Sequence, residues 1–271
     1  MKRAGIVLCG GRSSRMGRAK AWLPWFGKTM IEHVVATLRP VVDEVIVVTS
    51  EEVDLPPLGA RVVIDRAQGE GPLVGIREGL KAATADLAMV TSVDAPFLGS
   101  EFIDGLFGMG CAAAPVADEH VQVLCAIYPC GAWRDADELL RQGIRRPLRL
   151  LEGLEYKPVE LALSGGPSPW EGFNTPEAYL DAIRARDPAA TAEIEFLGRS
   201  ASRMAQPSFR LPVGTLGELF ARLPDSAALV ADGRLRKSNL VCLGGRDLVR
   251  DLSVPVGPDE RVSVIDALAG G

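Results

Sequence analysis

Short apolar runs without polar alternation recur along the first part of the chain, and segments of helical periodicity lie between them. An apolar run of this kind suits a strand that is buried on both faces of a sheet. Strands that alternate with helices predict an α/β domain with a doubly wound, mostly parallel sheet of Rossmann-like type. The expected strands are residues 4–9, 44–49, 61–65 and 86–92, and the expected helices are residues 29–38 and 73–83.

The second part of the chain changes character after a last helix that ends near residue 185. Residues 187–191 read as a short linker. Beyond it, two alternating strand patterns, a short helix capped by Thr215 and further apolar strands predict a small α+β domain. The expected organisation is a first domain over residues 1–186, the linker, and a second domain over residues 192–271. Within the first domain, residues 111–116 and 121–128 are expected to pair as an antiparallel hairpin.

Several polar or small residues fall where the expected parallel strands end. Gly10 and Gly11 follow the first strand, Thr49 ends the second, and Asp65 and Asp94 follow later ones. In open α/β sheets, ligands bind in the crevice beyond the carboxyl ends of the strands. The order of the sequence therefore predicts that these residues surround one ligand site.

Composition excludes some classes of function. The net charge of −5 leaves no general basic surface for nucleic acid. Five scattered cysteines and two histidines, without a paired-cysteine motif, give neither a disulfide framework nor a zinc site. No apolar run is long enough to span a membrane. We therefore expect a cytoplasmic protein with reduced thiols, bound to no membrane.

The loop after the first strand, residues 8–20, is the most informative stretch. Its glycines let backbone N–H groups approach a ligand, and such groups form a cavity that binds anions. Arg12, Arg15, Arg18 and Lys20 add positive charge to the same loop. The combination suits a triphosphate, although a solvated basic loop would show the same residues. The spacing matches neither the dinucleotide fingerprint nor the Walker loop.

This loop resembles the signature of the molybdenum cofactor nucleotidyltransferase family, L-x-G-G-x-S-x-R-M-G-x-x-K, at every fixed position. Residues 71–75 are similar to the family's G-P-L-x-G segment, and residues 92–98 to its C-D-x-P-F/Y-L segment, with Ser92, Val93 and Ala95 as departures. Asn174 matches the last Asn of the family's F-x-N-x-N-T-P-E-D segment, where it also suits a helix start. The resemblance covers about residues 4–185.

The resemblance implies transfer of GMP from GTP to molybdenum-bound molybdopterin, with release of pyrophosphate. It implies that Lys20 and Arg15 stabilise the phosphates and that Asp94 and Asn174 hold Mg²⁺, with Lys20, Arg15 and Asp94 as the catalytic residues. Thr49 stands where one branch of the family has Asn, so nucleotide contacts are expected to differ there. The implied nucleotide-binding residues are Leu8, Cys9, Gly10, Gly11, Lys20, Asp65, Gly71, Pro72, Leu73 and Asp94.

The second domain resembles the small subunit of molybdopterin synthase, a β-grasp protein that ends in Gly-Gly. Gly270 and Gly271 carry most of this resemblance. It implies a ubiquitin-like sulfur carrier whose partners are an adenylating enzyme and the large subunit of molybdopterin synthase. Residues 265–268 depart from the proline-containing stretch that usually precedes the tail.

Three alternatives stay open at this point. The first domain could use CTP or another phosphorylated acceptor, because base choice depends on a few loop contacts. The protein could serve mainly as a sulfur carrier on an inactive transferase scaffold. It could also be a nucleotide-binding regulator, although a Gly-Gly terminus would then have no explanation.

Overall fold

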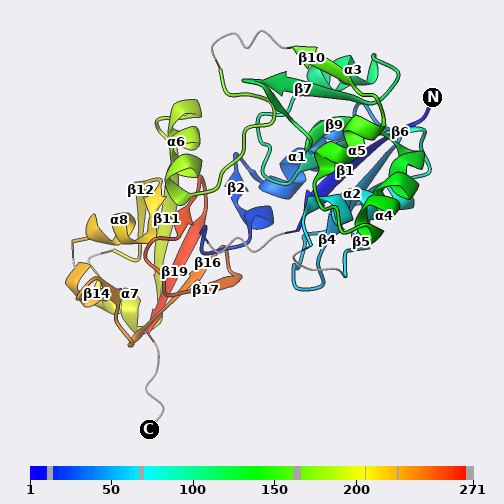
Figure 1. The fold of residues 1–271 in the computed structure, drawn as a ribbon. Coiled ribbons are helices and arrows are strands. Elements are labelled where there is room, and N and C mark those ends of the chain that lie inside the picture. Colours follow the sequence, from blue (N-terminus) through cyan, green and yellow to red (C-terminus); the bar gives the residue numbers. More distant parts are fainter. Residues whose placement is uncertain (11–14, 67–69, 161–165, 205, 225, 267–271) are drawn as a thin grey trace. The chain divides into compact units, whose positions relative to one another are not determined.

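The structure is a computed structural model that describes residues 1–10, 15–66, 70–160, 166–204, 206–224 and 226–266 (Figure 1). The chain forms two compact units. The first comprises Met1–Arg12 with Met30–Gly172, and the second comprises Ser13–Thr29 with Phe173–Gly271. The segment that follows the first strand thus belongs to the same unit as the C-terminal part of the chain. Within the described ranges, no helix combines the length and the apolar character that a membrane span requires.

The first unit is built on a sheet with the strand order β10-β7-β9-β6-β1-β4-β5, to which β8 adds by pairing with β7. The pairs β1–β4, β1–β6, β4–β5 and β7–β10 are parallel, which confirms the mostly parallel sheet. The pairs of β7 with β8 and with β9 are antiparallel, as the hairpin prediction required. The strands are β1 (Arg3–Cys9), β4 (Glu44–Thr49), β5 (Arg61–Ile64), β6 (Leu87–Ser92), β7 (Ala113–Ala117), β8 (His120–Val121), β9 (Cys125–Pro129) and β10 (Lys157–Glu160).

Helices cover both faces of this sheet. Ile6 of β1 belongs to the core cluster that also contains residues of α2, α4 and α5. The next residue toward the N-terminus, Gly5, faces the other way, where a Cβ would lie 3.1 Å from Leu38 of α1. Side chains alternate across a strand, so the two neighbours mark two helical layers around one sheet. The helices are α1 (Met30–Leu38), α2 (Pro72–Ala82), α3 (Ser100–Phe107), α4 (Trp133–Arg141) and α5 (Pro147–Gly153).

Helix α2 lies unusually close to the sheet because two of its residues are glycines. A Cβ on Gly79 would collide with Ile6 and would lie 3.2 Å from Val48, and a Cβ on Gly75 would lie 3.3 Å from Leu8. Glycine is unfavourable inside a helix, so its presence here reflects the close packing. The close approach fixes the N-terminal end of α2 beside the carboxyl ends of β1 and β4.

The second unit contains a sheet with the strand order β12-β11-β19-β16-β17. The central pair, β11 and β19, is parallel, and the outer pairs are antiparallel. Alternate residues of β11 are buried, as its sequence pattern predicted. Thr215 caps α8 in a reciprocal capping box with Glu218. The main elements are α6 (Pro176–Arg186), β11 (Thr191–Leu197), α7 (Arg199–Arg203), β12 (Ser208–Pro212), α8 (Leu216–Ala221), β16 (Asn239–Leu243), β17 (Asp247–Val249) and β19 (Arg261–Asp266).

The second unit also contains shorter elements, some in Ser13–Thr29 and some in Phe173–Gly271. A 3-10 turn, η1 (Lys20–Trp22), precedes a small hairpin of β2 (Pro24–Trp25) and β3 (Lys28–Thr29). Two further short pairs are antiparallel. They are β13 (Gly214–Thr215) with β18 (Pro255–Val256), and β14 (Val230–Ala231) with β15 (Arg234–Leu235). The two compact units divide the chain at positions other than the predicted linker. The linker over residues 187–191 stays a prediction.

The five cysteines are free thiols, and three of them are buried. Burial raises the pKa of Cys9 and of Cys130 from 9.0 to about 12, and burial also raises that of Cys125.

We expect a native thiol titration with Ellman's reagent to modify Cys111 and Cys242 and to spare the other three until denaturant is added. The pKa values of Cys9 and Cys130 are raised in the folded state. The buried, protonated thiols therefore contribute to the free energy of unfolding below pH 9, and this contribution is lost as the pH rises toward 12. Fast reaction of all five native thiols would contradict the burial.

Candidate active site

The carboxyl ends of four strands are tied together at one edge of the first unit's sheet. The N–H of Val93 donates to the carbonyl oxygen of Leu8 (3.0 Å), which joins the ends of β6 and β1. The hydroxyl of Thr49 donates to the carbonyl oxygen of Cys9 (3.2 Å), and the N–H of Asp65 donates to that of Thr49 (2.7 Å). The structure therefore brings together the residues that follow β1, β4, β5 and β6, as their order in the sequence predicted.

Asp94 lies just beyond β6 with a half-buried side chain. The hydroxyl of Ser92 donates a hydrogen bond to Oδ1 of Asp94. The following loop is attached to α1, because Nε2 of His33 contacts the carbonyl oxygen of Pro96 at 2.9 Å. A carbonyl oxygen only accepts, so Nε2 carries the proton in this contact. Both interactions hold the Asp94 carboxylate at the ligand edge of the sheet.

Gly172 packs directly against Asp94, a role for which no sequence motif singled it out. A Cβ at Gly172 would lie 2.6 Å from the carbonyl oxygen of Asp94 and 3.0 Å from its carboxyl carbon. Only glycine permits this approach of one backbone to another. The segment before α6 thereby limits where the carboxylate can move, although the only sequence signal is one glycine in a glycine-rich stretch.

Cys9 ends β1, but its thiol has no chemistry to offer at neutral pH. Burial raises the pKa of this thiol to about 12; the Thr49 contact opposes the shift, and the charge of Asp94 adds to it. The thiolate is the nucleophilic form of cysteine, and it is scarce at such a pKa. The part that Cys9 and Leu8 play is to form a rigid strand end from which Gly10 emerges.

The N-terminus of α2 has no side-chain cap among the described residues. Gly71 precedes the helix with φ of 90°, and Pro72 occupies the first turn. The first N–H groups of a helix have no partner within it, and they favour an anion. Gly71, Pro72 and Leu73 are therefore in a form that could receive a phosphate or the edge of a base.

Lys20, Arg15 and Asn174 belong to the second unit. Nζ of Lys20 donates to Oδ1 of Asn174 at 3.0 Å. The adjacent Thr175 caps α6 by accepting from the N–H of Ala178 (3.3 Å), which confirms the predicted helix start. The structure thus joins two predicted site residues that are 154 positions apart, and it leaves the side chain of Arg15 exposed.

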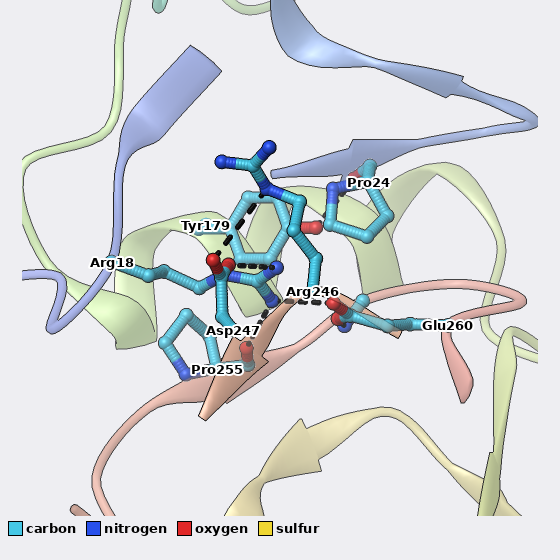
Figure 2. A network of polar contacts seen from close by, with 8 residues as sticks. Arg18, Pro24, Tyr179, Arg246, Asp247, Pro255 and Glu260 are labelled. Atoms are coloured by element: carbon cyan, nitrogen blue, oxygen red, sulfur yellow. Dashed lines mark hydrogen bonds and ion pairs between the residues drawn. The ribbon is translucent and has the colours of Figure 1, made fainter. Parts of the chain in front are cut away.

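Arg18 differs from the other basic residues of its loop. It was expected to contribute charge for a triphosphate, but its guanidinium is buried against Glu260 and Asp247 (Figure 2). This charge is therefore matched within the second unit. Gly11, Arg12, Gly270 and Gly271 lie outside the described residues.

The predicted Mg²⁺ ligands fit that ion chemically. Magnesium prefers oxygen ligands and is often held by one or two carboxylates together with substrate phosphates. Asp94 offers a carboxylate, and Asn174 offers an amide oxygen that already accepts from a cation. Across the described ranges, no group of three or more His, Cys, Asp or Glu side chains could hold a metal. Asp94 belongs to the first unit and Asn174 to the second, so a shared Mg²⁺ site stays a prediction.

Comparison with known proteins shows the family of the chain. The MobA-like NTP transferase domain matches residues 5–158. The molybdenum cofactor guanylyltransferase of Rhodobacter capsulatus is 36% identical over 198 residues, which cover 69% of this chain and 96% of that protein. A probable molybdenum cofactor guanylyltransferase of Mycobacterium avium (strain 104) is 35% identical over 170 residues, which cover 59% of this chain and 86% of that protein.

A solved structure shows the same fold. The 2-C-methyl-D-erythritol 4-phosphate cytidylyltransferase from Thermus thermophilus aligns with a TM-score of 0.53 at 18% identity, over 67% of this chain and 97% of that one. That likeness concerns the fold alone, whereas the sequence match spans more than half of the chain. The chain belongs to the MobA-like NTP transferase family and is a nucleotidyltransferase.

Proposed function

We propose that this protein transfers GMP from GTP to molybdenum-bound molybdopterin and releases pyrophosphate. The observation that carries the proposal is the Asp94 carboxylate, which Ser92 and Gly172 hold at the carboxyl edge of a nucleotidyltransferase sheet. The names of the Rhodobacter capsulatus and Mycobacterium avium relatives support the guanine nucleotide and the molybdenum cofactor as substrates.

The reaction needs positioning and charge neutralisation more than acid–base catalysis. A phosphate oxygen of the pterin forms a bond to the α-phosphorus of GTP, and the bond from that phosphorus to the bridging oxygen breaks as pyrophosphate leaves. The attacking phosphate is already an anion, so no strong general base is required. This agrees with a site that has no reactive thiol and no catalytic triad among its proposed residues.

Each proposed residue has one task in this scheme. Lys20 and Arg15 neutralise the triphosphate, and Lys20 stabilises the charge that develops on the leaving pyrophosphate. Asp94 and Asn174 hold Mg²⁺, which when bound supplies further charge neutralisation. The remaining residues hold the nucleotide through the strand ends and the start of α2. They are Leu8, Cys9, Gly10, Gly11, Asp65, Gly71, Pro72 and Leu73.

Nucleotide choice is tested by following pyrophosphate release from purified protein with Mg²⁺, molybdenum-loaded pterin and GTP, CTP or ATP in parallel. We expect release with GTP at a rate at least about tenfold above that with the other two, because a difference of one or two base contacts amounts to about 1.4 kcal/mol or more. A preference for CTP would transfer the proposal to a cytidylyltransferase. No release with any nucleotide would favour a carrier on an inactive transferase scaffold.

For the C-terminal part of the chain, we propose a role as a sulfur carrier. The support is the arrangement of its sheet, in which the first and last strands are parallel neighbours at the centre and hairpins flank them, with α8 packed on one face. This arrangement is typical of the β-grasp fold. An adenylating enzyme would join the carboxylate of Gly271 to AMP from ATP, with release of pyrophosphate. A sulfur donor at the oxidation level of sulfide would then displace AMP and leave a thiocarboxylate. Mass spectrometry should then show the replacement of one oxygen by sulfur, and an unchanged mass would reject the carrier role.

A further inference from the structure

The segment that carries Lys20 is held in the second unit by a buried ion pair. Nη1 of Arg18 lies 2.5 Å from Oε1 of Glu260, and its Nη2 lies 3.4 Å from Oδ2 of Asp247 (Figure 2). The side chains of Arg18 and Glu260 are only 4% and 3% exposed. Glu260 also accepts from the N–H of Gly257 at 2.9 Å, so its carboxylate is fixed by its own turn.

Removal of one partner from a buried ion pair strongly destabilises the folded protein. Taking both charges out of water is expensive, and the remaining charge has no compensation when its partner is removed. The buried Nε of Arg18 donates to no acceptor in the described part of the chain, so its two Nη groups make the polar contacts, to Glu260, Asp247 and the carbonyl oxygen of Pro255. Glu260 therefore determines where the Arg18 guanidinium lies, and with it the backbone of the loop.

Contacts on both sides of Lys20 complete this attachment. Before it, Gly17 has φ of 67°, and a Cβ there would lie 2.8 Å from Cγ2 of Val254. After it, Trp22 of η1 stacks with Arg246, whose guanidinium carbon lies 3.5 Å from the ring centroid. Lys20 thus lies between two attachments, both made to the C-terminal part of the unit.

The hairpin of β2 and β3, which follows η1, is also attached to the C-terminal part of the unit. The hydroxyl of Tyr179 on α6 donates to the carbonyl oxygen of Pro24. Burial raises the pKa of Tyr179 well above its usual value, so the phenol keeps its proton for this bond. Gly257 packs against both Tyr179 and Pro24, where a Cβ would lie 3.0 Å from that of Pro24. The turn that contains Glu260 therefore contacts the hairpin as well as Arg18.

Arg18, which makes this attachment, is not one of the fixed residues of the family signature. Arg18 occupies one of the two open positions between the fixed Gly17 and the fixed Lys20 of the family signature. A residue that the signature leaves open here connects the loop to the C-terminal part of the chain. The loop itself carries Arg15 and Lys20, the cations proposed to act on the phosphates.

We propose that Glu260, with Asp247, is a positioning residue for nucleotide transfer: the C-terminal part of the chain holds the loop of residues 15–22 so that Lys20 presents its ammonium in a fixed place. The C-terminal part then serves the transferase reaction as a structural component, whatever else it does. This inference rests on the proposed transfer of a nucleotide by Lys20.

The test compares full-length wild type with Glu260→Gln, which keeps the shape of the side chain and removes its charge. We expect kcat for nucleotide transfer to fall about 100-fold, since small displacements of catalytic groups have effects of that size. Hydrogen exchange of the amides in residues 15–25 should become faster. The matched control is Glu193→Gln, which removes a weak partner of Arg261 on the sheet surface of the same unit and should change neither quantity.

The two readouts separate the possible failures. If Glu260→Gln loosens residues 15–25 and keeps wild-type kcat, the positioning role is wrong. If exchange in this segment does not change, the attachment itself is wrong. If the wild type transfers no nucleotide, the proposed function fails, while exchange still reports on the attachment.

A second variant protects the test against loss of folding. Asp247 is the more exposed partner, with 28% of its side chain accessible, so Asp247→Asn leaves the buried pair in place. We expect a smaller fall in kcat, about tenfold, with the same faster exchange. An unchanged kcat in an Asp247→Asn protein whose loop exchanges faster would overturn the inference.

Discussion

Asp94→Asn should abolish nucleotide transfer while the protein stays folded. The amide keeps an oxygen that accepts from Ser92 and fits the space beside Gly172, so we expect little change in the free energy of unfolding. The lost negative charge removes the group proposed to hold Mg²⁺. Loss of several kcal/mol of charge stabilisation corresponds to a fall in kcat of about 1,000-fold. Pyrophosphate release at saturating GTP and Mg²⁺ measures it.

Asp118→Asn is the matched control for this substitution. Asp118 is exposed in the turn between β7 and β8 with φ of 46°, a conformation that Asn also adopts readily. The same chemical change there should leave kcat within error of the wild type. The Asp94→Asn protein should also need more Mg²⁺ for half-maximal rate. Wild-type activity in Asp94→Asn would show that this carboxylate is not a metal ligand.

Lys20→Met should have the second largest effect. The thioether fills a similar volume but donates nothing to Asn174 and brings no charge to the phosphates. Loss of one donor to developing charge lowers kcat by about 100- to 1,000-fold in other enzymes. We expect Lys20→Met to lower kcat by that amount and Lys20→Arg to recover part of it, with the Mg²⁺ requirement nearly unchanged.

Lys28→Met serves as its control, because Lys28 is an exposed cation of the same compact unit in the hairpin after η1. It should keep wild-type kcat. A Lys20→Met protein that is as active as Lys28→Met would remove Lys20 from the mechanism. It would also remove the reason for the attachment through Arg18 and Glu260.

Continuous apolar runs were the parts of the fold that the sequence predicted best. Strands β1, β4 and β6 are buried on both faces, so their composition alone distinguished them. Helix α4 was not anticipated, although Trp133, Ala136, Leu139 and Leu140 recur at helical spacing and pack on the core. Strand β10 is an exposed edge strand whose four residues include Lys157 and Pro158. Its pairing with β7 depends on the tertiary structure more than on local pattern.

The candidate site likewise has a part that the sequence predicted and a part that it did not. The neighbours of Asp94 at the strand ends followed from topology, because parallel strands share one carboxyl edge. The contacts of Gly172 with Asp94 and of Arg18 with Glu260 did not follow. Each joins segments far apart in the sequence, 242 positions in the second case, and no periodic pattern encodes such a pair. The buried Arg18 had no feature in the sequence that distinguished it from the other cations of its loop.

The fate of the α-phosphate of GTP tests the proposed transfer of GMP most directly. Purified protein is incubated with Mg²⁺, molybdenum-loaded molybdopterin and GTP labelled at the α-phosphorus, and the pterin fraction is separated and counted. We expect the label to enter a pterin dinucleotide in an amount equal to the pyrophosphate released, and we expect label at the γ-phosphorus not to enter it. Pyrophosphate release without labelled pterin would contradict GMP transfer to this acceptor.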